Sequence, residues 1–143
     1  RGRQIAAAFA LGAQGVWTGT IWLGTRESEL TPMEKEVLFK AKSEDAVQRK
    51  WMTGKTGRMI RSKASEAWEQ PGAPRHLKPP LQNILYHGAR IRIEKAHRDD
   101  LCSFPAGQVV GNMKEETSVR QVMQDLMQEY IDTAERISPL INL

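Results

Sequence analysis

The residues best suited to chemistry lie between Gly15 and Thr20, where the sequence reads Gly-Val-Trp-Thr-Gly-Thr. A glycine just after a short strand lets backbone N–H groups approach an anion with no Cβ in the way. If a helical turn begins there, its unpaired N–H groups add to the attraction, and the hydroxyls of Thr18 and Thr20 are further donors. The pattern indicates a phosphate-binding loop at Thr18, Gly19 and Thr20, although a strand followed by Gly and Thr is also a common plain turn.

The elements before this loop support that interpretation. Arg3 to Leu11 has the apolar spacing of a helix that ends at Gly12, and we expect Ala13 to Trp17 to form a short strand. β/α barrels build phosphate sites in this order, from the loops after strands seven and eight. The strand has no visible partner nearby, and the chain opens at Arg1, without an initiator Met, inside a helix-start pattern. We therefore expect the C-terminal part of a larger enzyme.

The rest of the chain reads as mainly helical. Thr31, Pro32 and Glu34 form a capping box that starts one helix, and Ser118 with Gln121 starts another. The predicted helices span residues 31–42, 56–69, 81–97 and 118–137, with a short helical turn over 43–47 and an extended segment over 48–52. The predicted fold class is α/β, a C-terminal fragment of a TIM-type β/α barrel over residues 1–30 with a mainly helical C-terminal extension over 31–143.

Composition excludes several classes of protein. The 143 residues are 40% apolar and 27% charged, with a net charge of +4 spread along the chain. No apolar run approaches the roughly 20 residues that a membrane span needs. The single cysteine, Cys102, permits no disulfide within the chain and reads as a half-buried structural thiol. The lone cysteine and the lack of a signal-peptide pattern at residues 1–11 favour a reducing, cytoplasmic setting. The three histidines lack metal-ligand spacing, so we expect no metal site.

A resemblance to a known family extends over nearly the whole chain. Residues 2–23 look like the end of the barrel in nitronate monooxygenases, the family formerly called 2-nitropropane dioxygenases. Other flavin barrels share this first block, whereas three later blocks are more particular to the family. These are Trp51 to Lys55 with Arg58 to Arg61, Glu66 to Glu69, and Pro105 to Gly111.

The resemblance implies an FMN-dependent enzyme that oxidises alkyl nitronates with oxygen to a carbonyl compound and nitrite. It implies that Gly19 and Thr20 hold the FMN phosphate through main-chain N–H groups, and that the segment containing Gln108 folds back towards the flavin. The active-site His of the family lies in a Gly-rich loop that has no counterpart here. We therefore assign no catalytic residue to this chain and expect it to be inactive alone. The implied partners are a small nitronate and oxygen, with no nucleic acid and no membrane, and the oligomeric state stays open.

A rival interpretation comes from a different functional class. Six basic residues surround Trp51, and a basic stretch of this kind can bind along the phosphates of a nucleic-acid backbone. These residues are Arg49, Lys50, Lys55, Arg58, Arg61 and Lys63. A small basic helical module that binds nucleic acid is therefore the alternative, although a solvated face with partly covered side-chain stems explains the same pattern.

Overall fold

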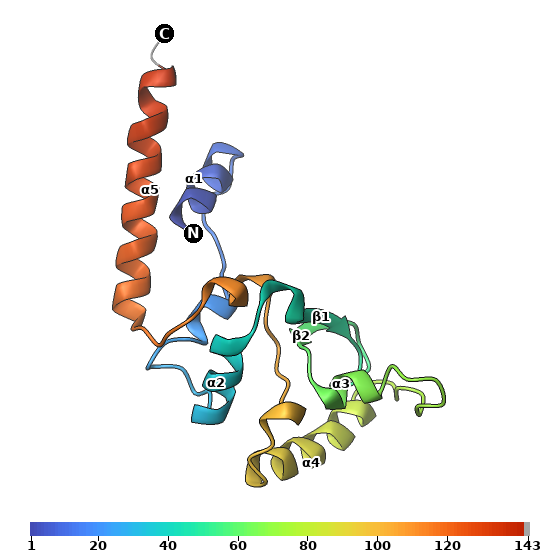
Figure 1. The fold of residues 1–143 in the computed structure, drawn as a ribbon. Helices are drawn as coiled ribbons and strands as arrows, with labels where there is room; N and C mark the ends of the chain where they lie inside the picture. Colours follow the sequence, from blue (N-terminus) through green and yellow to red (C-terminus); the bar gives the residue numbers. More distant parts are fainter. Residues whose placement is uncertain (142–143) are drawn as a thin grey trace.

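The computed structural model describes residues 1–141. Figure 1 shows α1 lying beside the long α5, and the remaining elements gathered below them. The α-helices are α1 Gly2–Ala10, α2 Pro32–Lys40, α3 Lys63–Ala67, α4 Leu81–Lys95 and α5 Val119–Ile141. The strands are β1 Ala46–Arg49 and β2 Gly57–Ile60, and the 3-10 turns are η1 Thr20–Trp22, η2 Ser43–Asp45, η3 Asp99–Leu101 and η4 Gln108–Asn112.

The first helix ends as its sequence predicts. Gly12 follows the last helical residues with a φ of +97°, in the left-handed region that favours glycine. The N–H of Gly12 donates to the carbonyl of Phe9 at 2.9 Å, and the N–H of Ala13 donates to that of Ala8 at 3.0 Å. This pair of bonds is a Schellman motif, which satisfies carbonyls at the helix end.

Helices α1 and α5 pack closely because a glycine stands at their crossing. Gly2 is buried, and a Cβ placed on it would lie 2.6 Å from both the Cβ of Glu129 and the backbone nitrogen of Tyr130. Farther along, the rings of Phe9 and Tyr130 meet edge to face at 5.7 Å. The covered side of α5 includes Val122, Leu126 and Tyr130, which recur every four residues and share one face of the helix, whereas Met123 and Ile131 are exposed.

The two capping predictions have different outcomes. In α2, the Oγ1 of Thr31 accepts from the N–H of Glu34 at 3.3 Å, and the Glu34 carboxylate accepts from the N–H of Thr31 at 2.9 Å, so the capping box is complete. In α5, Ser118 accepts from the N–H of Gln121 at 3.1 Å, but the Gln121 side chain donates to another residue of its own helix. Only half of the second capping box is therefore present.

The prediction of a helix over residues 56–69 is wrong in its first half. β2 occupies Gly57–Ile60 and pairs antiparallel with β1, in the register that sets Ala46 opposite Ile60. The helix starts only at Lys63, because the Oγ of Ser62 accepts from the N–H of Ser65 at 3.2 Å and caps it there. β1 likewise replaces the last part of the short helical turn predicted over 43–47.

The hairpin depends on its turn and on a third segment. Gly54, in the turn, has a φ of +77°, and a Cβ there would collide with the backbone oxygen of Leu77. On the other edge of β2, the N–H of Ile60 donates to the carbonyl of Phe104 at 3.1 Å. The N–H of Ala106 donates to the carbonyl of Arg58 at 3.3 Å, so residues 104–106 line up beside β2.

Two apolar clusters include residues of this sheet, Ile60 in one and Met59 in the other. The larger joins α2, the hairpin and the 102–110 segment, and consists of Leu38, Ala41, Ala46, Ile60, Cys102, Phe104, Ala106 and Val110. The smaller consists of Trp51, Met52, Met59 and Tyr86. Through Tyr86, it packs α4 against the turn of the hairpin. α4 runs unbroken through Gly88, and no helix within residues 1–141 combines the length and apolar content needed to cross a bilayer.

Candidate functional site

The segment before the predicted phosphate loop is not a strand. Residues 15–19 form no ladder, and Val16 and Trp17 are exposed, the latter completely. A β-strand requires hydrogen bonds to a neighbour, and within residues 1–141 none lies alongside this segment. The prediction of a strand over residues 13–17 is therefore wrong for this structure. The turn after it is present, because η1 begins at Thr20.

Backbone N–H groups at the loop are left free. Within residues 1–141, the N–H groups of Gly19, Thr20 and Ile21 donate no hydrogen bond to the protein. The loop is held from the other side, since the indole Nε1 of Trp22 donates to the carbonyl of Thr18 at 2.9 Å. A Cβ placed on Gly19 would meet no protein atom within 4 Å. The loop therefore offers unpaired donors beside open space, which suits an anion.

The structure brings the Gln108 segment to this loop. The N–H of Gly107 donates to the Oγ1 of Thr20 at 2.9 Å, across 87 positions of sequence. Gln108 follows directly, is exposed, and begins η4. The hydrogen bond joins the two regions that sequence analysis singled out separately. The fold therefore places Thr18, Gly19, Thr20 and Gln108 in one neighbourhood.

Two hollows open on this loop and share Gly19 and Thr20. One has a volume of about 440 Å³ and is lined by Gly19, Thr20, Leu23, Arg58, Pro105, Ala106 and Gly107. The other, of about 310 Å³, lies towards α1 and α5 and includes Thr18, Val16, Ile5 and Leu126. The only charged side chain lining the first hollow, among the residues described, is Arg58.

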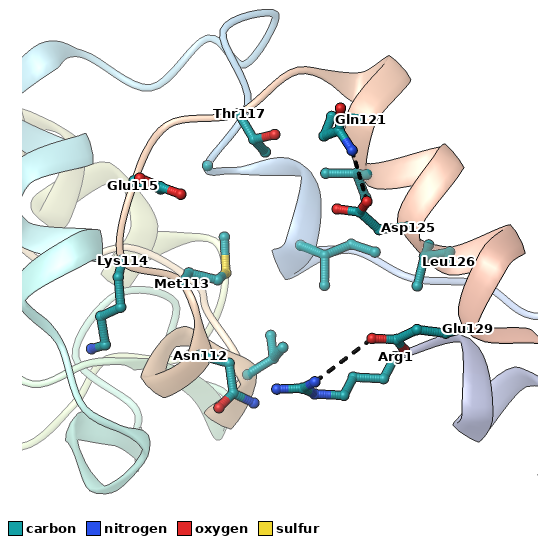
Figure 2. Close-up of a pocket in the computed structure, with 14 residues that line it drawn as sticks. Arg1, Asn112, Met113, Lys114, Glu115, Thr117, Gln121, Asp125, Leu126 and Glu129 are labelled. Atoms are coloured by element: carbon teal, nitrogen blue, oxygen red, sulfur yellow. Dashed lines mark hydrogen bonds and ion pairs between the residues drawn. The ribbon is translucent and has the colours of Figure 1, made fainter. Parts of the chain in front are cut away.

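A third hollow, of about 360 Å³, lies between α5 and the 109–117 segment (Figure 2). Several of its polar side chains already have partners in the protein. Arg1 pairs with Glu129 at 3.6 Å, and Gln121 donates to Asp125 at 2.7 Å. Lys114 donates to the carbonyl of Ala41 at 2.9 Å. These contacts stabilise the fold, and the loop at Thr18 to Thr20 remains the better candidate site.

The buried ionisable groups are structural. Burial raises the pKa of Tyr86 to about 12, and its hydroxyl donates to the carbonyl of Ser103 at 2.9 Å. Burial likewise raises the pKa of the Cys102 thiol to about 12, so the thiolate needed for nucleophilic attack is scarce at neutral pH. Within residues 1–141, no group of three or more His, Cys, Asp or Glu side chains is arranged to hold a metal ion.

Much of the basic stretch around Trp51 is engaged within the chain. Arg49 pairs with Glu66 at 2.8 Å, and Lys63 pairs with Asp100 at 3.3 Å. Arg61 donates to a backbone carbonyl at 3.2 Å. These contacts fit the interpretation of a solvated, internally paired face better than a track for a nucleic-acid backbone.

Two residues of the site escaped sequence analysis as site residues. Gly107 joins it through a backbone N–H, which no residue type reveals. Arg58 joins it through β2, an element read from the sequence as a helix. The local signals were two blocks of the family resemblance, Pro105 to Gly111, which carries Gly107, and Arg58 to Arg61.

Comparisons with known proteins point to the same family. The family model described as nitronate monooxygenase matches residues 1–129. A Mycobacterium tuberculosis protein named as a monooxygenase is 40% identical over 147 residues, which cover 99% of this chain and 39% of the relative. A Bacillus subtilis protein named as a probable nitronate monooxygenase is 35% identical over 129 residues, which cover 90% of this chain and 37% of the relative.

Solved structures give the same picture. The chain is similar to a nitroalkane oxidase from Streptomyces ansochromogenes, with a TM-score of 0.79 and 27% identity over 96% of this chain and 38% of that one. It is also similar to FabK from Thermotoga maritima, with a TM-score of 0.74 and 29% identity over 98% of this chain and 44% of that one. The chain thus spans about two fifths of the length of these two curated relatives. The predicted fold class, part of a TIM-type β/α barrel with a mainly helical extension, is confirmed.

Proposed function

The chain belongs to the nitronate monooxygenase family, and on that premise we propose that it supplies the flavin-phosphate site of an FMN-dependent enzyme. The proposed reaction oxidises an alkyl nitronate with oxygen to a carbonyl compound and nitrite. Because the chain spans about two fifths of its curated relatives, the activity is proposed for the whole protein. The substrate class, the oxygen and the cofactor are parts of this proposal.

One observation carries the proposal. The N–H groups of Gly19 and Thr20 are unpaired within residues 1–141, and a Cβ placed on Gly19 would meet no protein atom within 4 Å. An FMN phosphate is a dianion at neutral pH and prefers such charge-assisted hydrogen bonds from backbone donors. The residues present therefore fit the phosphate end of FMN.

Each residue of the site has a distinct proposed role. Gly19 keeps the approach open, and its N–H and that of Thr20 donate to phosphate oxygens. Thr18 offers a hydroxyl at the edge of the second hollow. Thr20 also accepts from the N–H of Gly107, which holds the segment of Gln108 beside the loop. We propose that Gln108 faces the flavin from this segment.

The bound flavin would supply the electron transfer, and this chain would bind and orient it. No residue here receives a catalytic role. We propose that residues 1–30 end the flavin-binding barrel and residues 31–143 extend it, with α5 returning to pack on α1. A single buried cysteine fits a reducing cytoplasmic setting, which we propose as the location.

The proposal is tested with the protein expressed from its complete reading frame. After reconstitution with FMN, a small alkyl nitronate should cause oxygen uptake and release of nitrite, and omission of FMN should abolish both. The 143-residue chain expressed alone serves as the comparison and should show no turnover. Oxygen uptake that is absent with every alkyl nitronate tried, in protein carrying one FMN per chain, would contradict the proposed reaction.

A further inference from the structure

We propose that Arg58 binds the phosphate group of the flavin and thereby makes the site select FMN over flavins that lack a phosphate. The inference rests on the proposed function, because it concerns the same hollow. It assigns a role to a residue on β2, remote in sequence from the loop that holds Gly19 and Thr20. Three observations on the Arg58 guanidinium support the inference: where it lies, what holds it there, and the N–H donors that it has left for a ligand.

Arg58 is held at the wall of the hollow by the segments that lie beside its strand. Its backbone carbonyl accepts from the N–H of Ala106 at 3.3 Å, and its Nη1 donates to the carbonyl of Ala46 at 2.6 Å. The two bonds anchor the residue at its backbone and at its tip. A guanidinium group carries five N–H donors in a rigid plane, so one such tether leaves most of them available.

The charge of Arg58 is not neutralised within the protein. No Asp or Glu of residues 1–141 forms an ion pair with it. Arg49, on the paired strand β1, shows the opposite situation, because its guanidinium lies 2.8 Å from Glu66 and 3.9 Å from Glu69. Arg58 therefore keeps a full positive charge that a ligand can meet.

The composition of the hollow makes an anion the fitting ligand. Its wall has one charged side chain, Arg58, and no acid among the residues described. The free N–H groups of Gly19 and Thr20 come from the facing loop. Backbone donors carry no full positive charge, whereas a guanidinium adds a charge and a planar pair of donors to them. The phosphate ester of FMN is the part of the proposed cofactor with this chemistry.

The test compares FMN with riboflavin, which has the same ring system and no phosphate. Both are titrated into the flavin-free protein, expressed from its complete reading frame, and followed by the quenching of flavin fluorescence. Arg58→Gln should raise the Kd for FMN about tenfold or more, because charge-assisted hydrogen bonds are lost. The Kd for riboflavin should stay within about twofold of the wild-type value, since riboflavin makes no such bonds.

Arg61→Gln is the matched control. Arg61 lies directly after β2 and also donates to a backbone carbonyl, that of Glu44 at 3.2 Å, but it does not line the hollow. Its replacement should change neither Kd, and any loss of stability from a missing tether should be similar in the two variants. Arg58→Lys, which keeps the charge without the planar fork, should fall between wild type and Arg58→Gln.

A second readout uses salt. Raising the salt concentration should weaken FMN binding in the wild type more than in Arg58→Gln, because one charge pair is screened in the first and absent in the second. Equal weakening of FMN and riboflavin by Arg58→Gln would show a structural role only and overturn the inference. Unchanged FMN binding would also overturn it and would leave the proposed function standing. A wild-type protein that binds no flavin would overturn both.

Discussion

Replacing Gly19 by Val separates binding from folding at the proposed phosphate loop. Gly19 has a φ of −118°, which Val accepts, and a Cβ there meets no protein atom within 4 Å. The variant should therefore fold normally, with a change in unfolding free energy within about 0.5 kcal/mol. The same side chain would stand where the phosphate approaches the N–H groups of Gly19 and Thr20.

The expected loss of affinity follows from the bonds removed. Two charge-assisted hydrogen bonds at about 1.5–3 kcal/mol each amount to about 3–6 kcal/mol, or at least a hundredfold in Kd. The assay measures the Kd for FMN by fluorescence titration and the melting temperature of the flavin-free protein. Gly15→Val is the control, because Gly15 also has open space around it but lines neither hollow. If Gly19→Val retained the wild-type Kd for FMN, the phosphate would have to bind elsewhere.

Three further predictions concern the fold that positions this loop. In a urea titration, Leu126→Asp should lower the free energy of unfolding by about 2–4 kcal/mol, because Leu126 faces α1. Met123 is 47% exposed, so Met123→Asp should lower it by under about 0.5 kcal/mol. Gly54→Ala should lower the melting temperature more than Gly72→Ala, because both have a positive φ but only a Cβ on Gly54 meets backbone; equal losses would show that the conformation alone matters. Burial raises the pKa of Tyr86 to about 12, against 10.0 in the unfolded chain. The unfolded state therefore loses the Tyr86 proton first, and the free energy of unfolding should fall between about pH 10 and 12. Tyr86→Phe should reduce that fall when unfolding is measured as a function of pH.

The sequence predicted correctly those features of the fold that depend on residues close together in the chain. The capping box of Thr31 and Glu34 and the left-handed Gly12 lie where expected, because each depends on residues within one turn of helix. The periodic face of α5 is covered by α1 at Leu126 and Tyr130. Such features need no knowledge of distant chain segments.

Features built from distant contacts could not be predicted in this way. The hairpin was hidden because Met59, Ile60 and Ala64 also fit a helical period, and only the pairing with β1 and residues 104–106 favours the strand. The strand expected at 13–17 does not form, since a strand needs a neighbour to pair with and none lies beside this segment within residues 1–141. The start of α5 is held by Glu27, whose carboxylate accepts from the N–H of Val119 across 92 positions, and this bond lowers the pKa of Glu27.

The same distinction applies to the candidate site. The sequence and the family resemblance pointed to the loop Thr18 to Thr20 and to Gln108. The hydrogen bond between Thr20 and Gly107 shows how this loop and the segment of Gln108 come together. Their binding of flavin stays a prediction. Arg58 entered only with the sheet, because its place at the hollow depends on three segments far apart in the sequence.

The central claim is that this chain holds the phosphate of FMN, and a crystal structure of the protein loaded with FMN tests it most directly. The account predicts phosphate oxygens within hydrogen-bond distance of the backbone nitrogens of Gly19 and Thr20, with the guanidinium of Arg58 on the same phosphate. A flavin phosphate bound away from Gly19 and Thr20 would contradict it.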